Sequence, residues 1–221
     1  MKRDLNAKLK TGRNTKQAQR AQRAKKLTLA LIASLVLGLS AAGAGQAAGE
    51  FKPFSIYSDE SAPDNHFAST GWMGDYADIT VDGAFTVNPH AGSTSIKVTY
   101  SKMASQGAGW AGVYWQEPAN NWGNRPGGFD LTGAAKLTFW ARGDKGGETI
   151  NEFKMGGIKG QYPDSGAAGI GPVVLTTEWK QYTIDLAGKD LTNVIGGFCW
   201  ASALDKNPNG AVFYLDDIRY E

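Results

Sequence analysis

The residues best suited by type to do chemistry lie in the stretch Ala111–Asn124, whose sequence is AGVYWQEPANNWGN. It holds three aromatic residues, one glutamine, one glutamate and three asparagines within fourteen positions. Aromatic rings stack on the apolar faces of a ligand, and amide or carboxylate groups pair with its hydroxyls. The stretch therefore favours either a surface that holds a polyhydroxylated ligand or the edge of a catalytic site around Glu117.

Catalysis would need a partner for Glu117. A glycoside hydrolase generally places two carboxyl groups roughly 5–10 Å apart around the scissile bond. No two glutamates here share a strand face at a matching spacing. The other glutamates available are Glu148, Glu152 and Glu178.

Other catalytic signatures are equally weak in this sequence. The two histidines, His66 and His90, occur in the turn-rich segments PDNHF and NPHAG and are expected to form loop hydrogen bonds. The sequence shows no Ser-His-Asp signature, no HExxH motif and no phosphate-binding glycine loop. We therefore predict no catalytic residue, with a glycoside hydrolase or polysaccharide lyase as the enzymatic alternative.

The elements that must position these residues are short strands. Runs of alternating apolar and polar residues recur after residue 49, and no segment there has a helical period. Turn clusters such as NPHAGS and LDKNPNG separate the runs. This pattern predicts an all-β fold, an antiparallel β-sandwich or jelly roll in one domain. The predicted strands are FSIYSDE (54–60), Ser95–Ser101, AGVYWQ (111–116), Lys136–Arg142, Ile150–Met155, Trp179–Leu186, Val194–Ala201 and Ala211–Tyr220.

Alternation within each run predicts which side chains leave the core. In AGVYWQ, inward Val113 and Trp115 turn Tyr114 and Gln116 outward. In the later strands, inward aromatic residues leave Trp140 outward, unless a neighbouring loop covers it. The ligand-contacting residues predicted are Tyr114, Gln116, Asn121, Trp122, Trp140, Arg142, Lys154 and Trp200.

The first 48 residues are typical of an export signal. A basic segment, residues 1–26, precedes an uncharged run from Leu27 to Gly49. The strongly apolar part, Leu27–Leu39, is shorter than the roughly 20 residues of a bilayer span. We predict a signal peptide over 1–48, cleaved between Ala44 and Ala48, with an uncleaved signal anchor as the alternative. The remaining residues, 49–221, would be exported and would meet a membrane only through that segment.

The charge and the cysteine content exclude one class of partner and one kind of cross-link. The first 48 residues hold ten of the 23 basic residues and one of the 21 acidic ones, which leaves 13 and 20 for residues 49–221. A net charge of −7 repels phosphate backbones, so nucleic acid is excluded as a partner. The single cysteine, Cys199, rules out an internal disulfide, and its apolar surroundings predict a buried side chain.

Four stretches resemble the galactose-binding-like β-jelly-roll carbohydrate-binding modules of secreted bacterial proteins. The resemblance covers roughly residues 54–221 and implies a non-catalytic sandwich that binds a polysaccharide or oligosaccharide through aromatic and polar side chains. Phrases such as FWARG and FYLDDI recur in several such families with different ligands. The four stretches are WAGVYWQEPANNWG, LTFWARGDKGGE, LTTEWKQYTIDL and GAVFYLDDIRYE.

The same resemblance implies a structural calcium ion near the two ends of the domain. Asp216 matches the ligand that the family places in its final strand, and Asp59, Glu60 and Asp217 are further candidates. Calcium takes six to eight oxygen ligands, which a cluster of carboxylates could provide. The alternative is an acidic strand end that is simply solvated.

Taken together, these observations predict an exported single-domain jelly roll that binds a carbohydrate without chemistry. Besides the enzymatic alternative, a surface adhesion or structural domain that recognises protein stays open. Such modules commonly accompany a catalytic domain, whereas this sequence holds a leader and one module. Targeting of an attached enzyme is therefore not the expected role.

Overall fold

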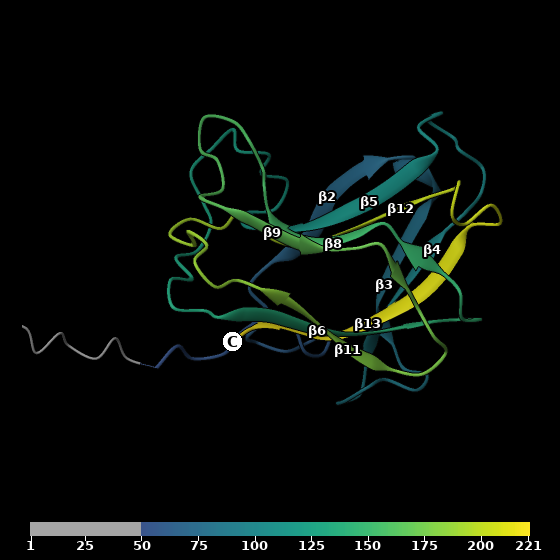
Figure 1. The fold of residues 1–221 in the computed structure, drawn as a ribbon, viewed down its shortest axis with the longest axis horizontal. Helices are drawn as coiled ribbons and strands as arrows, with labels where there is room; N and C mark the ends of the chain where they lie inside the picture. The colour runs from purple at the N-terminus through teal and green to yellow at the C-terminus, as the bar shows by residue number, and fades with distance from the viewer. Residues whose placement is uncertain (1–49) are drawn as a thin grey trace, which may run out of the picture. The chain divides into compact units, whose positions relative to one another are not determined.

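Two antiparallel sheets stack face to face in the described part of the chain, residues 50–221 of a computed structural model (Figure 1). The predicted signal segment, residues 1–48, lies outside these residues. Among the residues described, the one helical element is the short 3-10 helix η1 (Tyr76–Asp78). No helix between residues 50 and 221 is long and apolar enough to cross a membrane.

The strands divide into two main sheets and one small pair. Sheet A has the order β11-β6-β13-β4-β3, with β1 also paired to β13, and sheet B has the order β2-β5-β12-β8-β9. Sheet A contains β1 (Phe54–Tyr57), β3 (Ile79–Phe85), β4 (Ser95–Tyr100), β6 (Lys136–Gly143), β11 (Lys180–Asp185) and β13 (Ala211–Tyr220). Sheet B contains β2 (Ala68–Gly74), β5 (Trp110–Gln116), β8 (Glu152–Gly156), β9 (Ala167–Ile170) and β12 (Gly196–Ala203). The separate pair is β7 (Thr149–Ile150) with β10 (Val173–Val174).

The core lies between the two sheets and is built by strand alternation. Val113 of β5, Phe139 of β6 and Phe153 of β8 are fully buried in it. The rings of Phe139 and Phe153 have centroids 4.7 Å apart and so join sheet A to sheet B. Each fully buried side chain of this size contributes about 1.5–3 kcal/mol relative to leaving it in water. The core fixes which side chains remain for the two outer faces.

The predicted all-β sandwich is confirmed, and the first and last strands lie together as expected. The sequence did not predict β2, β3, β9 or β10. In β2 and β3 the alternation is weakened by glycine, and in β2 that glycine has a packing reason. A Cβ at Gly71 would lie 2.7 Å from Cβ of Tyr114, so the two strands can approach only because the residue has no side chain.

Candidate functional site

The outer face of sheet B is a strip of mostly small side chains. Across its centre, Tyr114 of β5 lies opposite both Gly71 of β2 and Cys199 of β12. Cys199 lies opposite Lys154 of β8, which in turn lies opposite Gly169 of β9. The alternation predicted for β5 is confirmed, because Trp115 packs in the core while Tyr114 belongs to a separate cluster on this outer side.

In a second row on this face the side chains project even less from the sheet. Met73 of β2 lies opposite Gly112 of β5, Gly112 opposite Ala201 of β12, and Ala201 opposite Glu152 of β8. Between Met73 and Glu152 the row holds only Gly112 and Ala201, and the methyl group of Met73 lies over Gly112. A flat molecule can therefore come close to the sheet here. We call these two rows, together with Trp110 and Trp122, which flank them in the direction of β5, the sheet B face.

Two exposed indoles flank this floor. Trp110 at the start of β5 is 40% exposed, and its spacing from Tyr114 places both on the outer side, about 13 Å apart along the strand. Trp122 is also 40% exposed, and its ring meets that of Tyr114 edge-on, with centroids 6.0 Å apart. Large aromatics left in water around a flat floor are typical of a contact surface.

Polar groups stand along the β8–β9 side of the sheet B face. The ammonium of Lys154 lies 3.0 Å from Oε2 of Glu152 and 5.5 Å from the ring centroid of Tyr114. Beside Glu152, a pocket of about 310 Å³ opens at the sheet edge. These groups supply donors and acceptors next to the aromatic rings. The pocket is lined by Asn151, Glu152, Gly169, Ile170 and Gly171.

Trp122 is carried by a loop, residues 117–128, that buried amides hold in shape. The Gln116 side chain donates from Nε2 to the carbonyl of Asn121 at 2.9 Å. The Asn121 side chain donates to the carbonyl of Arg125 at 3.0 Å and accepts from the N–H of Gly123 at 3.1 Å. Gln116 and Asn121 are both 0% exposed. Their predicted contact with a ligand is therefore corrected: they support Trp122 from beneath.

A second loop, residues 157–166, braces the first. The N–H of Tyr162 donates to the carbonyl of Gly123 at 2.9 Å. Gly123 has φ +78°, and a Cβ there would lie 2.2 Å from the carbonyl oxygen of Lys159, so only glycine permits this contact. At the base of the loop, Asp164 accepts the N–H groups of Ile158, Ile195 and Gly196. The loop that carries Trp122 is thus held in place both by the buried amides of Gln116 and Asn121 and by loop 157–166.

The titratable groups on the sheet B face do not form a catalytic set. Burial raises the pKa of the Tyr114 hydroxyl, which donates to the carbonyl of Gly156 at 3.0 Å. Burial also raises the pKa of the Cys199 thiol, and the side chain is fully buried as predicted. Neither group ionises near neutral pH to give a nucleophile. Glu152 is the one carboxylate among the residues of this face, so the paired carboxyl groups of a hydrolase are not assembled there.

The prediction that Trp200 contacts a ligand is wrong. Its side chain is fully buried, lies opposite Val113 and Phe153 in the sheet, and packs edge-on against Phe213 with centroids 5.1 Å apart. The alternation of β12 turns Cys199 and Ala201 outward instead. Trp200 therefore belongs to the core and has no contact with either outer face.

Trp140 and Arg142 lie on the opposite side of the molecule, on the outer face of sheet A. Their strand, β6, pairs with β11 and β13, whereas Lys154 belongs to sheet B. The His90 ring stacks on the indole of Trp140, with centroids 3.7 Å apart and planes at 17°. The alternative that a loop covers Trp140 is therefore the one observed. The predicted ligand set is divided between two faces and cannot form one site.

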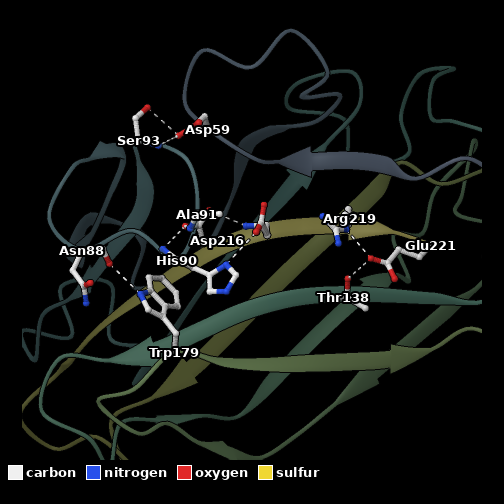
Figure 2. A network of polar contacts seen from close by, with 11 residues as sticks. Asp59, Asn88, His90, Ala91, Ser93, Thr138, Trp179, Asp216, Arg219 and Glu221 are labelled. Carbon is white, nitrogen blue, oxygen red and sulfur yellow. Dashed lines mark hydrogen bonds and ion pairs between the residues drawn. The ribbon is translucent and has the colours of Figure 1, made fainter.

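The covering segment, residues 86–94, is held by carboxylates from β13 and from the loop after β1 (Figure 2). Asp216 of β13 accepts the N–H of His90 at 2.8 Å, and Asp59 accepts the N–H of Ser93 at 2.9 Å. Burial raises the pKa of Asp216 to about 6, with the nearby charge of Asp217 adding to the effect. These acids act as anchors for the segment.

The same geometry bears on the expected calcium ion. The carboxylate oxygens of Asp59 and Asp216 face backbone N–H donors, the reverse of the oxygen cage that calcium needs. Within residues 50–221, no group of three or more Asp, Glu, His or Cys side chains is arranged to hold a metal. Asp59 and Asp216 thus accept backbone hydrogen bonds, and the calcium ion, with Glu60 and Asp217 as further candidate ligands, stays an untested prediction.

Three contributors to the sheet B face were missed from the sequence: Met73, Trp110 and Glu152. Trp110 and Tyr114 are four residues apart in one strand, so the alternation could have predicted that both face the outer side. Met73 lies in a strand that was not predicted. Glu152 was considered only as a possible catalytic carboxylate.

Several solved structures share this architecture, of which two are given. The first is a family 30 carbohydrate-binding module, with a TM-score of 0.52 and 15% identity over 77% of this chain and 88% of that chain. The second is a family 11 module from Clostridium thermocellum in complex with a β-1,3-1,4-mixed-linked tetrasaccharide, with a TM-score of 0.50 and 14% identity over 76% of this chain and 94% of that chain. The fold is that of the carbohydrate-binding modules. No protein-family model and no curated protein matches the chain. At this level of identity the similarity extends to the fold, and the ligand must be argued from the surface.

Proposed function

We propose that residues 49–221 bind a polysaccharide or oligosaccharide on the sheet B face without catalysing any reaction. The observation that carries this proposal is the placement of exposed Trp110 and Trp122, which flank, in the direction of β5, a floor made of Gly112, Ala201 and other small residues. Sugar rings present apolar C–H faces that stack on indoles, and a low floor lets several rings lie along the strand.

Polar recognition on the same face comes from Glu152 and Lys154. Their partly exposed carboxylate and ammonium can pair with hydroxyls beside the stacked rings. The pocket next to Glu152 has room for a substituent or branch that leaves the main chain of the ligand. The family 11 module with its bound tetrasaccharide supports a glycan as the ligand class, since it shares the fold.

The proposal includes export. The basic and apolar order of residues 1–48 supports a signal peptide that delivers the domain to the cell surface, periplasm or medium. With an uncleaved anchor, the domain would be held at the membrane and still present its sheet B face.

The test is a glycan array probed with the purified protein, followed by calorimetry on the best oligosaccharide and chromatography of the mixture. We expect binding with the oligosaccharide recovered intact. Release of shorter products would instead support the hydrolase or lyase alternative. Absence of binding to any neutral glycan on the array, with binding to a surface protein, would support the adhesion alternative.

A further inference from the structure

The outer face of sheet A carries a row of cations resting on aromatic rings. Arg142 of β6 and Lys97 of β4 lie opposite the two sides of Tyr214 in β13. The guanidinium carbon of Arg142 is 3.7 Å from the ring centroid of Tyr214 and 5.2 Å from that of Trp179. The ammonium of Lys97 is 5.0 Å from the ring centroid of Phe85. We call Lys97, Arg142, Trp179 and Tyr214 the Arg142 row.

Neither cation of this row forms an ion pair in the described part of the chain. Five ion pairs occur there, and none includes Arg142 or Lys97. In addition, Nε of Arg142 is buried without any hydrogen-bond partner. Arg219 on the same face is different, because its Nε lies 2.6 Å from a carboxylate oxygen of Glu221 (Figure 2). The two cations therefore rest on aromatic rings and form no ion pair with a carboxylate of the described residues.

Two acids lie beside the row, and each accepts a hydrogen bond from within the domain. Asp144 accepts the hydroxyl of Tyr214 at 2.8 Å, and Asp82, which lies opposite Lys97, accepts the N–H of Ala84 at 3.0 Å. Trp179 is fixed by donating from its indole N–H to the carbonyl of Asn88 at 3.0 Å (Figure 2). The aromatic walls and the cations are thus preorganised, and a ligand would pair with the terminal nitrogens of the Arg142 guanidinium, because its Nε is buried.

A carboxylate is the group that matches these nitrogens. The planar guanidinium fork pairs with carboxylates in two parallel hydrogen bonds. Stacking already orders the arginine side chain, so binding removes little further conformational freedom from it. Trp179 beside Arg142 offers a surface on which a sugar ring can stack. Because neighbouring strands lie about 4.8 Å apart, the backbones that carry Arg142 and Lys97 are about 10 Å apart. The row can therefore meet two acidic groups of one chain.

We propose that the Arg142 row is a second binding site, on the sheet opposite the sheet B face, that takes a carboxylate-bearing oligosaccharide such as an oligogalacturonate. This site differs from the proposed function in its position and in the charge of its ligand, and it does not depend on that function. It would let one domain hold a neutral and an acidic glycan at the same time.

The test is calorimetry of the purified protein with hexagalacturonate and with a neutral galactan oligosaccharide of equal length. We expect hexagalacturonate to bind more tightly than the neutral galactan oligosaccharide, and we expect its affinity to fall as salt rises from 50 to 500 mM, since the contact is electrostatic. Arg142→Gln should weaken binding about tenfold or more, and Lys97→Gln by a smaller factor. The matched control Arg219→Gln, which removes a paired arginine from the same face, should leave binding unchanged.

Thermal midpoints of all variants identify any that do not fold. If Arg142→Gln fails to fold, Arg142→Lys keeps the charge without the fork and should still weaken hexagalacturonate binding. Absence of hexagalacturonate binding to the wild-type protein, or equal binding by wild type, Arg142→Gln and Lys97→Gln, would overturn the proposal. A Trp122→Ala variant separates the two sites, since it should lose the neutral ligand and keep hexagalacturonate.

Discussion

Trp122 meets Tyr114 edge-on, with ring centroids 6.0 Å apart and planes at 86°. This contact joins a loop residue that is 40% exposed to a strand residue that is almost fully buried. Edge-to-face pairs of this kind contribute about 0.5–1.5 kcal/mol beyond the area they bury. The indole that we assign to the ligand is therefore held by the sheet below it.

The buried amides beneath Trp122 give the first prediction. Asn121→Ala should lower the free energy of unfolding by about 1–3 kcal/mol, because it leaves the buried N–H of Gly123 and the partly buried carbonyl of Arg125 without partners. The same variant should weaken glycan binding through loss of the loop shape. Urea denaturation and calorimetry measure the two effects. The matched control Asn124→Ala, at an exposed position of the same loop, should change neither; equal effects in both variants would contradict a special role for Asn121.

The floor of the sheet B face gives the second prediction. Ala201→Leu adds bulk between Gly112 and Glu152 on the outer side of β12, so it should weaken glycan binding at least tenfold while the thermal midpoint stays close to that of the wild type. Calorimetry with the oligosaccharide found on the array measures the loss. Undiminished affinity in a folded Ala201→Leu protein would place the ligand elsewhere.

The third prediction concerns pH and Asp216. Its pKa is raised to about 6 by burial, whereas an unfolded aspartate titrates near 3.9. The folded state therefore binds the proton more readily, and this group should stabilise the fold progressively as pH falls from about 7 to about 4. Thermal melts across this range should show the rise in the wild type and a smaller one in Asp216→Asn.

Asp130→Asn is the matched control for this experiment. Hydrogen bonds from Thr132 hold the pKa of Asp130 below its usual range, so its stabilising contribution is present above pH 4 and is lost only below that value. Asp130→Asn should thus keep the wild-type slope between pH 7 and pH 4. A wild-type slope in Asp216→Asn as well would show that other groups cause it.

The fourth prediction concerns calcium. A bound ion at one hundred times its Kd would add about 2.7 kcal/mol, which for a domain of this size corresponds to roughly 5–10 °C in the thermal midpoint. Because Asp59 and Asp216 face N–H donors, we expect no such difference between melts in EDTA and in millimolar calcium. A rise of several degrees with calcium, lost in Asp216→Asn, would restore the site implied by the family resemblance.

The sequence was sufficient to predict the all-β fold class and the orientation of the side chains in β5. In β5 the period of two separates Trp115 from Tyr114 because large apolar residues fall on one side of the strand. In β12 both sides are apolar or small, so the alternation does not reveal that Trp200 is inside and Ala201 outside. Residue size was the remaining clue, since glycine, alanine and cysteine share the outer side.

The division of the predicted site between two sheets could not be derived from the sequence. Trp140 and Lys154 are both outward residues, but β6 and β8 belong to different sheets, and such pairing is set by contacts between distant segments. The roles of Gln116 and Asn121 were hidden for a related reason. An amide that binds a ligand and an amide that supports a loop look alike until its hydrogen-bond partners are known.

The most direct measurement is calorimetry of the array-identified neutral oligosaccharide against wild type, Trp110→Ala, Trp122→Ala and the control Trp179→Ala on the opposite sheet. Each of the first two should lose about tenfold or more in affinity, because exposed aromatic anchors dominate such surfaces, and Trp179→Ala should match the wild type. Full affinity in both Trp110→Ala and Trp122→Ala, with loss in Trp179→Ala, would contradict the assignment of the glycan to the sheet B face.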